Sequence, residues 1–117
     1  MLGIICGLKS EAKIADRIPS ALVACSVARP EQALVLARHI AAQRVDRLIS
    51  FGLAAGLSED LVAGDLVLAG SVMTAKDAWE ADHDWNNKFL DRMLTAICVP
   101  VWGSQSIMQT EHHKEMV

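Results

Sequence analysis

The first half of the chain alternates short apolar runs with amphipathic segments, and this alternation restricts the possible folds more than any other feature. Residues 2–6, 21–27, 48–51 and 66–72 form apolar runs that predict β-strands. Strands that are apolar throughout and separated by helices typically lie in a parallel sheet covered on both faces. We therefore predict the α/β class, with one domain over residues 1–117.

Local signals place the expected helix ends. Ser10 is the expected N-cap of a helix that runs to residue 18, because Pro19 stops it. Pro30 opens a second helix that ends near residue 45. Its apolar face is predicted from residues at helical spacing: Ala33, Leu36, Ala37, Ile40 and Ala41.

The pattern loosens after residue 73. Residues 76–87 are expected to form an exposed loop, and Asn86 is expected to cap a helix through residue 97. Residues 99–101 and 104–108 are strand candidates, and Thr110 is a candidate cap for a short helix.

Hydrophobic residues make up 52% of the chain and charged residues 21%, which is apolar for a domain with so few expected helices. Up to six strands would have two faces to cover. We expect the fold to be C-terminally incomplete, or covered by another subunit in a homo-oligomer.

Several classes are disfavoured. No apolar run approaches the roughly 20 residues of a transmembrane helix, and residues 1–8 lack the basic leader of a signal peptide, so we expect a cytoplasmic protein. The net charge of −3 and the lack of a basic stripe argue against a nucleic-acid partner. The three cysteines, Cys6, Cys25 and Cys98, are interpreted as buried free thiols.

A run of small residues follows the third expected strand: Gly52, Leu53, Ala54, Ala55 and Gly56. Open α/β sheets bind ligands beyond the carboxyl ends of their strands, where small residues let backbone amides approach a phosphate or a ribose. The alternative is a tight strand exit with a purely structural role. The run has neither the Walker sequence nor the dinucleotide-binding glycine spacing.

Glu11 follows the first expected strand and Gly7, so it is expected at the same edge of the sheet. A carboxylate there could position or activate a water molecule. Alternatively, Glu11 is a favourable acidic residue in the first turn of a helix.

Three blocks of the chain, residues 3–11, 49–57 and 63–68, resemble successive blocks of the nucleoside phosphorylase and methylthioadenosine/adenosylhomocysteine nucleosidase superfamily. The closest likeness is to its hopanoid-associated phosphorylase branch. The chain corresponds to about the N-terminal half of such a protein. The resemblance implies a three-layer αβα fold around a mostly parallel or mixed sheet.

The resemblance also implies cleavage of the N-ribosidic bond of a purine nucleoside, of adenosine type, by phosphate or by water. It assigns Glu11 to holding the attacking water. It assigns Gly7 and the loop from Gly52 to Gly56 to substrate binding. No cofactor or metal is implied beyond phosphate as a possible co-substrate.

The chain departs from the family pattern at several points. Leu53 replaces a frequent Ser or Thr, Ala55 replaces a frequent glycine, and residues 28–30 stand where glycines are common. Arg29, in that segment, could contact phosphate or could be solvated. The family's Met-Glu segment and the Asp that protonates the purine should lie beyond Val117. Activity of the short chain is therefore in doubt.

Other residues are weaker candidates for a functional site. Asp82, His83 and Asp84, and the pair His112 and His113, suggest a metal site, but solvated loop and helix faces are the favoured interpretation, because adjacent residues on a helix point about 100° apart. Trp79 and Trp85 could wall a base pocket or serve as core or interface anchors. Two further hypotheses stay open: a non-catalytic ligand-binding or assembly subunit of the same fold, and an unrelated α/β domain.

Overall fold

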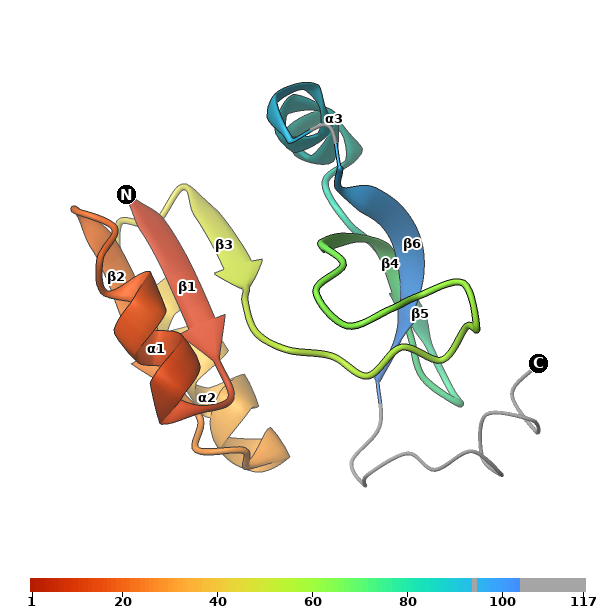
Figure 1. The fold of residues 1–117 in the computed structure, drawn as a ribbon. Helices are drawn as coiled ribbons and strands as arrows, with labels where there is room; N and C mark the ends of the chain where they lie inside the picture. The colour runs from red at the N-terminus through yellow and green to blue at the C-terminus, as the bar shows by residue number, and fades with distance from the viewer. Residues whose placement is uncertain (94, 104–117) are drawn as a thin grey trace. The chain divides into compact units, whose positions relative to one another are not determined.

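The computed structural model describes residues 1–93 and 95–103, and the chain divides into two compact units, Met1–Ala55 and Gly56–Val117. Each unit contains one three-stranded sheet (Figure 1). The predicted α/β class is confirmed. The single domain over residues 1–117 and the three-layer arrangement of the whole chain stay predictions.

The sheet of the first unit is parallel, with the strand order β2-β1-β3. Its strands are β1 (Leu2–Cys6), β2 (Ala21–Cys25) and β3 (Arg47–Ser50). Helix α1 (Lys9–Ala15) joins β1 to β2, and helix α2 (Pro30–Ala41) joins β2 to β3. The apolar runs of the sequence therefore predicted both the strands and their parallel pairing.

The two helices cover opposite faces of this sheet (Figure 1). On one face, Ile4 and Cys6 of β1 pack with Ala15 of α1 in a buried cluster. Side chains alternate along a strand, so Gly3 points to the other face. A Cβ atom on Gly3 would lie 2.7 Å from Cγ2 of Ile40 in α2. The missing side chain therefore allows α2 to pack closely against β1.

The start of α1 differs from the prediction. The N-cap is Leu8, and Ser10 lies inside the helix. Leu8 has no side chain that can cap, but Glu11, the third residue of the helix, accepts a hydrogen bond from the Leu8 N–H. The second helix begins at Pro30 as predicted, and it ends at Ala41, earlier than expected.

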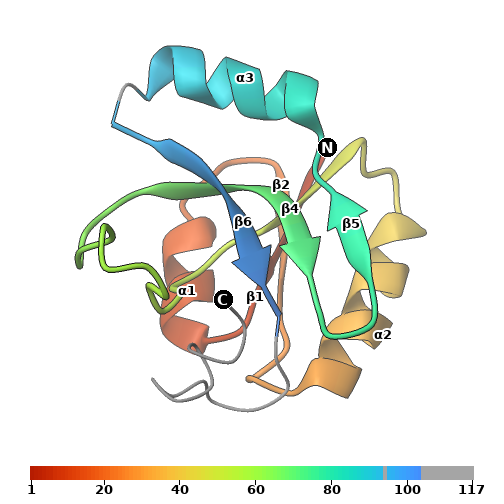
Figure 2. The ribbon, with the colours of Figure 1, turned by 90° about the vertical axis from the view of Figure 1, so that its right-hand side faces the viewer.

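The second unit contains β4 (Val67–Met73), β5 (Ala78–Glu80), helix α3 (His83–Arg92) and β6 (Ile97–Trp102). Strand β4 lies between the other two, antiparallel to β5 and parallel to β6 (Figure 2). The pairing with β6 is irregular between Ala69 and Ser71. Pro100, which has no N–H to donate, pairs at this irregularity, where the loss of a ladder hydrogen bond is tolerated.

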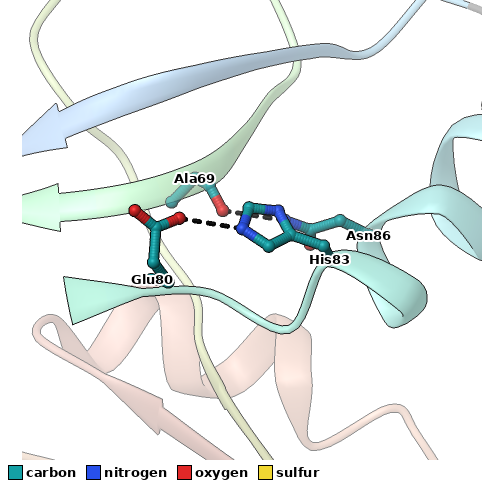
Figure 3. Close-up of polar contacts among 4 residues, drawn as sticks. All are labelled: Ala69, Glu80, His83 and Asn86. Carbon is teal, nitrogen blue, oxygen red and sulfur yellow. Dashed lines mark hydrogen bonds and ion pairs between the residues drawn. The ribbon is translucent and has the colours of Figure 1, made fainter.

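Three predictions in this unit were wrong. The helix expected to run through residue 97 ends at Arg92, and Ile97 begins β6. The expected loop at residues 76–87 contains β5 and the start of α3. The cap of α3 is Asp82, whose Oδ1 accepts from the Trp85 N–H at 2.9 Å. Asn86 instead donates from Nδ2 to the Ala69 carbonyl at 2.8 Å, which ties α3 to β4 (Figure 3). The expected strand at 104–108 and the helix from Thr110 lie outside the described residues.

Candidate functional site

The carboxyl ends of β1, β2 and β3 meet at one edge of the first sheet, because the three strands are parallel. The chain leaves β1 for β2 on one side, while β3 pairs with β1 on the other side. Such a reversal of strand order leaves a crevice between the outgoing loops, which is the usual ligand position in open α/β sheets. The exits of β1 and β3 are therefore the first place to look for a site.

Glu11 joins these two exits. Its Oε1 accepts hydrogen bonds from the backbone N–H groups of Gly7 at 3.2 Å and Leu8 at 2.9 Å. Its Oε2 accepts from the N–H of Leu53 at 2.7 Å. The residue is only 7% exposed. The structure thus brings together the two features that the sequence singled out.

Gly52 is the point of closest approach between the β3 exit and Glu11. A Cβ atom on Gly52 would lie 2.5 Å from Oε2 of Glu11, far below a normal van der Waals contact. Gly7, on the other side of the carboxylate, has more room, since its Cβ atom would lie 3.8 Å from Oε1. The lack of a side chain at Gly52 is therefore what lets the carboxylate reach the Leu53 N–H.

The remaining residues of the small-residue loop are open to solvent. The Leu53 side chain is 88% exposed, and Ala54 and Ala55 are also exposed. Gly56 belongs to the second unit, where its nearest neighbour is Leu61. Ligand contact by these residues stays a prediction.

The exit of β2 is attached to the same edge. The Gly7 carbonyl accepts from the Ala28 N–H at 2.8 Å. Val27 and Ala28 have φ values of 49° and 60°, in the left-handed region that favours glycine. Glycine would adopt this conformation at lower steric cost than Val27 or Ala28.

Ser26 and Cys25, which the sequence analysis did not assign to the site, also lie at this edge. Ser26 is buried, and its Oγ donates to the Cys6 carbonyl at 3.4 Å. The pKa of the Cys6 thiol is raised, chiefly because burial disfavours the thiolate and further because Glu11 is close. Only their position after a strand end could have indicated Ser26 and Cys25 in the sequence.

The arrangement leaves Glu11 with limited free capacity. An ionised carboxylate offers about four acceptor positions, and three are occupied by backbone N–H groups. About one position remains, on Oε2, the oxygen with a single donor. A hydroxyl group or a water molecule is the kind of donor that this position would accept.

The other candidates do not form a comparable site. Asp82, His83 and Asp84 are exposed, and His83 Nε2 lies 2.8 Å from Oε2 of Glu80, also on the surface (Figure 3). Within residues 1–93 and 95–103, no group of three His, Cys, Asp or Glu side chains could hold a metal ion. His112 and His113 lie outside the described residues.

The two tryptophans lie on different elements of the second unit. Trp79, on β5, is 55% exposed. Trp85, on α3, packs against Phe89 with a tilted geometry and ring centroids 5.2 Å apart. This contact supports an anchoring role for Trp85, while a base pocket involving either ring stays a prediction.

Comparison of the chain with family models, curated proteins and solved structures finds no match. No helix among the described residues is long and apolar enough to cross a membrane. Functional inference therefore depends on the geometry around Glu11 and on the resemblance in the sequence.

Proposed function

We propose that the edge of the first sheet forms the ribose side of a nucleoside site, in a protein that cleaves the N-ribosidic bond of adenosine-type purine nucleosides. The observation that carries the proposal is the hydrogen bond between Glu11 Oε2 and the Leu53 N–H. It connects the exits of β1 and β3, where an open α/β sheet binds its ligand. The three sequence blocks that resemble nucleoside phosphorylases and nucleosidases supply the substrate class.

In this proposal Glu11 acts by orientation. Its free acceptor position would take a hydrogen from the attacking water in hydrolysis, or from a ribose hydroxyl when phosphate is the nucleophile. The carboxylate would also favour the positive charge that develops on the ribose in an oxocarbenium-like transition state. The backbone N–H groups of the exposed residues Ala54 and Ala55 would approach the nucleophile, while the Leu53 N–H holds Glu11.

The proposed reaction also needs an acid that protonates the leaving purine. An acid for the leaving purine would come from a segment beyond residue 117 or from another subunit, so the short chain by itself would be inactive or partner-dependent. The three-layer phosphorylase-like fold, the homo-oligomer and the cytoplasmic location belong to the same proposal.

A second function, a non-catalytic ligand-binding or assembly subunit, is favoured by one specific observation. Three backbone donors already occupy the Glu11 carboxylate, so the residue holds two loops together whether or not a reaction occurs. Such a subunit would bind a nucleoside without cleaving it.

Two assays on the same samples separate these functions: calorimetric titration with a 5′-substituted adenosine, and release of adenine with and without phosphate. We expect binding by the chain and a loss of binding in Glu11→Gln, because the new amide would point an N–H group at the Leu53 N–H. Glu31→Gln is the matched control, since Glu31 is an exposed acidic residue in the first turn of α2.

Each outcome has a definite meaning once circular dichroism shows that the variants are folded. Adenine release that is lost only in Glu11→Gln supports the enzyme. Binding without release supports a nucleoside site at Glu11 and agrees both with the subunit and with an enzyme that needs its partner for cleavage. The absence of both, or equal binding by Glu11→Gln and the wild-type chain, contradicts a nucleoside site at Glu11.

A further inference from the structure

Two cysteines end neighbouring strands directly opposite each other. Cys6 of β1 and Cys25 of β2 are register partners in the parallel sheet. Side chains alternate along a strand, so every second residue of β1 (2, 4 and 6) points to one face, as does every second residue of β2 (21, 23 and 25). Both sets point to the same face, because both contribute to the cluster beneath α1: Ile4, Cys6, Ala21 and Val23. The two thiols therefore lie on the same face of the sheet.

The spacing of the strands suits a disulfide. Neighbouring strands are about 4.8 Å apart, and the Cα atoms of disulfide-bonded cysteines lie roughly 4.4–6.8 Å apart. Partners in register at the ends of two strands can therefore be bridged with little movement of the backbone. Cys98, the third cysteine, lies on β6 in the second unit and is exposed.

The two thiols differ in accessibility. Cys6 is 1% exposed, and burial raises its pKa. Cys25 is half-buried, and its Sγ donates weakly to the Gly7 carbonyl at 3.7 Å. An oxidant from solvent reaches Cys25 first, and Cys6 is placed to react with the oxidised product.

We propose that Cys6 and Cys25 form a reversible disulfide when the protein meets a peroxide. The Cys25 thiolate attacks one peroxide oxygen and breaks the O–O bond, which gives a sulfenic acid and releases hydroxide, protonated to water. The Cys6 sulfur then attacks the sulfenic sulfur. An S–S bond forms, the S–O bond breaks, and the hydroxide leaves as water with the thiol proton. Two thiols and one hydrogen peroxide thus give one disulfide and two waters.

The disulfide would alter the loop that holds Glu11. Oxidation removes the hydrogen that Cys25 donates to Gly7, whose own N–H donates to Glu11. The bond would also cross-link the ends of β1 and β2 beside the crevice. The disulfide itself does not depend on the proposed nucleoside site, because it is formed and detected without any nucleoside.

The test uses the full chain and its Cys98→Ser variant, which removes the exposed thiol that could link two molecules. Each is treated with hydrogen peroxide, alkylated and digested with trypsin. We expect the intact mass to fall by two hydrogens. We also expect a linked pair of peptides, residues 1–9 with residues 18–38, since trypsin does not cleave between Arg29 and Pro30. Dithiothreitol should restore both thiols.

Cys25→Ser is the matched control, and it should lose the linked peptides while keeping its circular dichroism spectrum. The proposal is overturned if Cys6 and Cys25 are both alkylated at a peroxide concentration that oxidises Cys98 in the wild-type chain. It is also overturned if Cys25 advances to sulfinic acid while Cys6 stays free. If Cys98→Ser fails to fold, the linked peptides are measured in the wild-type chain instead.

Discussion

The two units each have three strands, but they differ in how well their side chains are buried. Every buried residue of the described chain lies in the first unit: Gly3, Ile4, Cys6, Glu11, Ala15, Ser26 and Ile40. Among the described residues of the second unit, α3 is the one helix, and it contacts the sheet at β4. In the first unit, α1 and α2 cover both faces of the sheet (Figure 1). Among the described residues, the sheet with a helix on each face is thus the one that buries side chains.

The described residues of both units expose large apolar side chains, for example Val35 and Leu53 in the first and Val62, Trp79 and Ile97 in the second. This exposure agrees with the surplus of hydrophobic residues in the sequence. Further polypeptide or a second copy of the chain would cover these apolar side chains and remove them from water. Self-association stays a prediction.

The largest expected effect is on the core of the first unit. Ile4→Ala should lower the free energy of unfolding by about 2–5 kcal/mol, because the Ile4 side chain of β1 is fully buried beneath α1. Val72→Ala in the second unit is the control and should cost less, since Val72 is partly exposed. Urea denaturation with hydrogen exchange resolved by peptide would measure both, and equal losses would break the contrast between the units.

The contact of Gly52 with Glu11 should give the next largest effect. Gly52→Ala should destabilise the first unit by about 1–3 kcal/mol, because the new methyl group overlaps the carboxylate. Gly7→Ala is the control in the same site, with an ordinary contact distance, and should cost less. Thermal unfolding compares the two, and a Gly52→Ala variant as stable as wild type would show that Glu11 does not lie against the β3 exit.

A smaller effect is expected at the cap of α3 in the second unit. Asp82→Ala should cost about 1 kcal/mol, because it removes the acceptor of the Trp85 N–H. Hydrogen exchange should rise in peptides of α3 while peptides of β1 and α1 keep their protection. Faster exchange in both units would contradict their separate stability.

The smallest effect concerns pH. The N-terminal amine donates to Asp46 at 2.6 Å and holds the pKa of that carboxyl below its usual value of 3.8. A depressed folded pKa gives stability that is present above the unfolded pKa and is lost as the pH falls through the folded value. Asp46→Asn should therefore remove a small part of the loss of stability that occurs as the pH falls below about 5. Added salt should shrink the difference, because the pair is exposed. Acid unfolding titrations of the wild-type chain and Asp46→Asn at low salt would measure this difference in stability. Superimposed curves would refute the prediction.

The sequence predicted the first unit better than the second for a physical reason. Strands β1 and β2 of the first unit are continuous apolar runs, and such runs are typical of parallel strands that have helices on both faces of their sheet. The convergence of Glu11 and the loop at Gly52 followed from one rule, that parallel strands end at the same edge. The partnership of Glu11 with backbone N–H groups could not be predicted, because it depends on side-chain geometry after the backbone has folded.

The two errors in the helix caps share one cause, which is competition among nearby polar residues for the backbone N–H groups at the start of a helix. Ser10 and Asn86 are good caps by residue type, but Glu11 and Asp82 make the hydrogen bonds that set the helix starts. Strand β5 was missed because Trp79 stands among acidic residues, and its pairing with Val72 of β4 provides the missing support. Tertiary pairing thus decided where local preference was ambiguous.

The central claim is that the carboxylate of Glu11 and the β3 exit form one nucleoside site, and amide NMR tests it most directly. A titration with a 5′-substituted adenosine, and separately with free adenine, would follow the N–H resonances of Gly7, Leu8 and Leu53. We predict that the nucleoside shifts all three and that adenine shifts them much less, because the ribose faces Glu11. Resonances that stay in place while the nucleoside binds elsewhere, or no binding at all, would contradict the account.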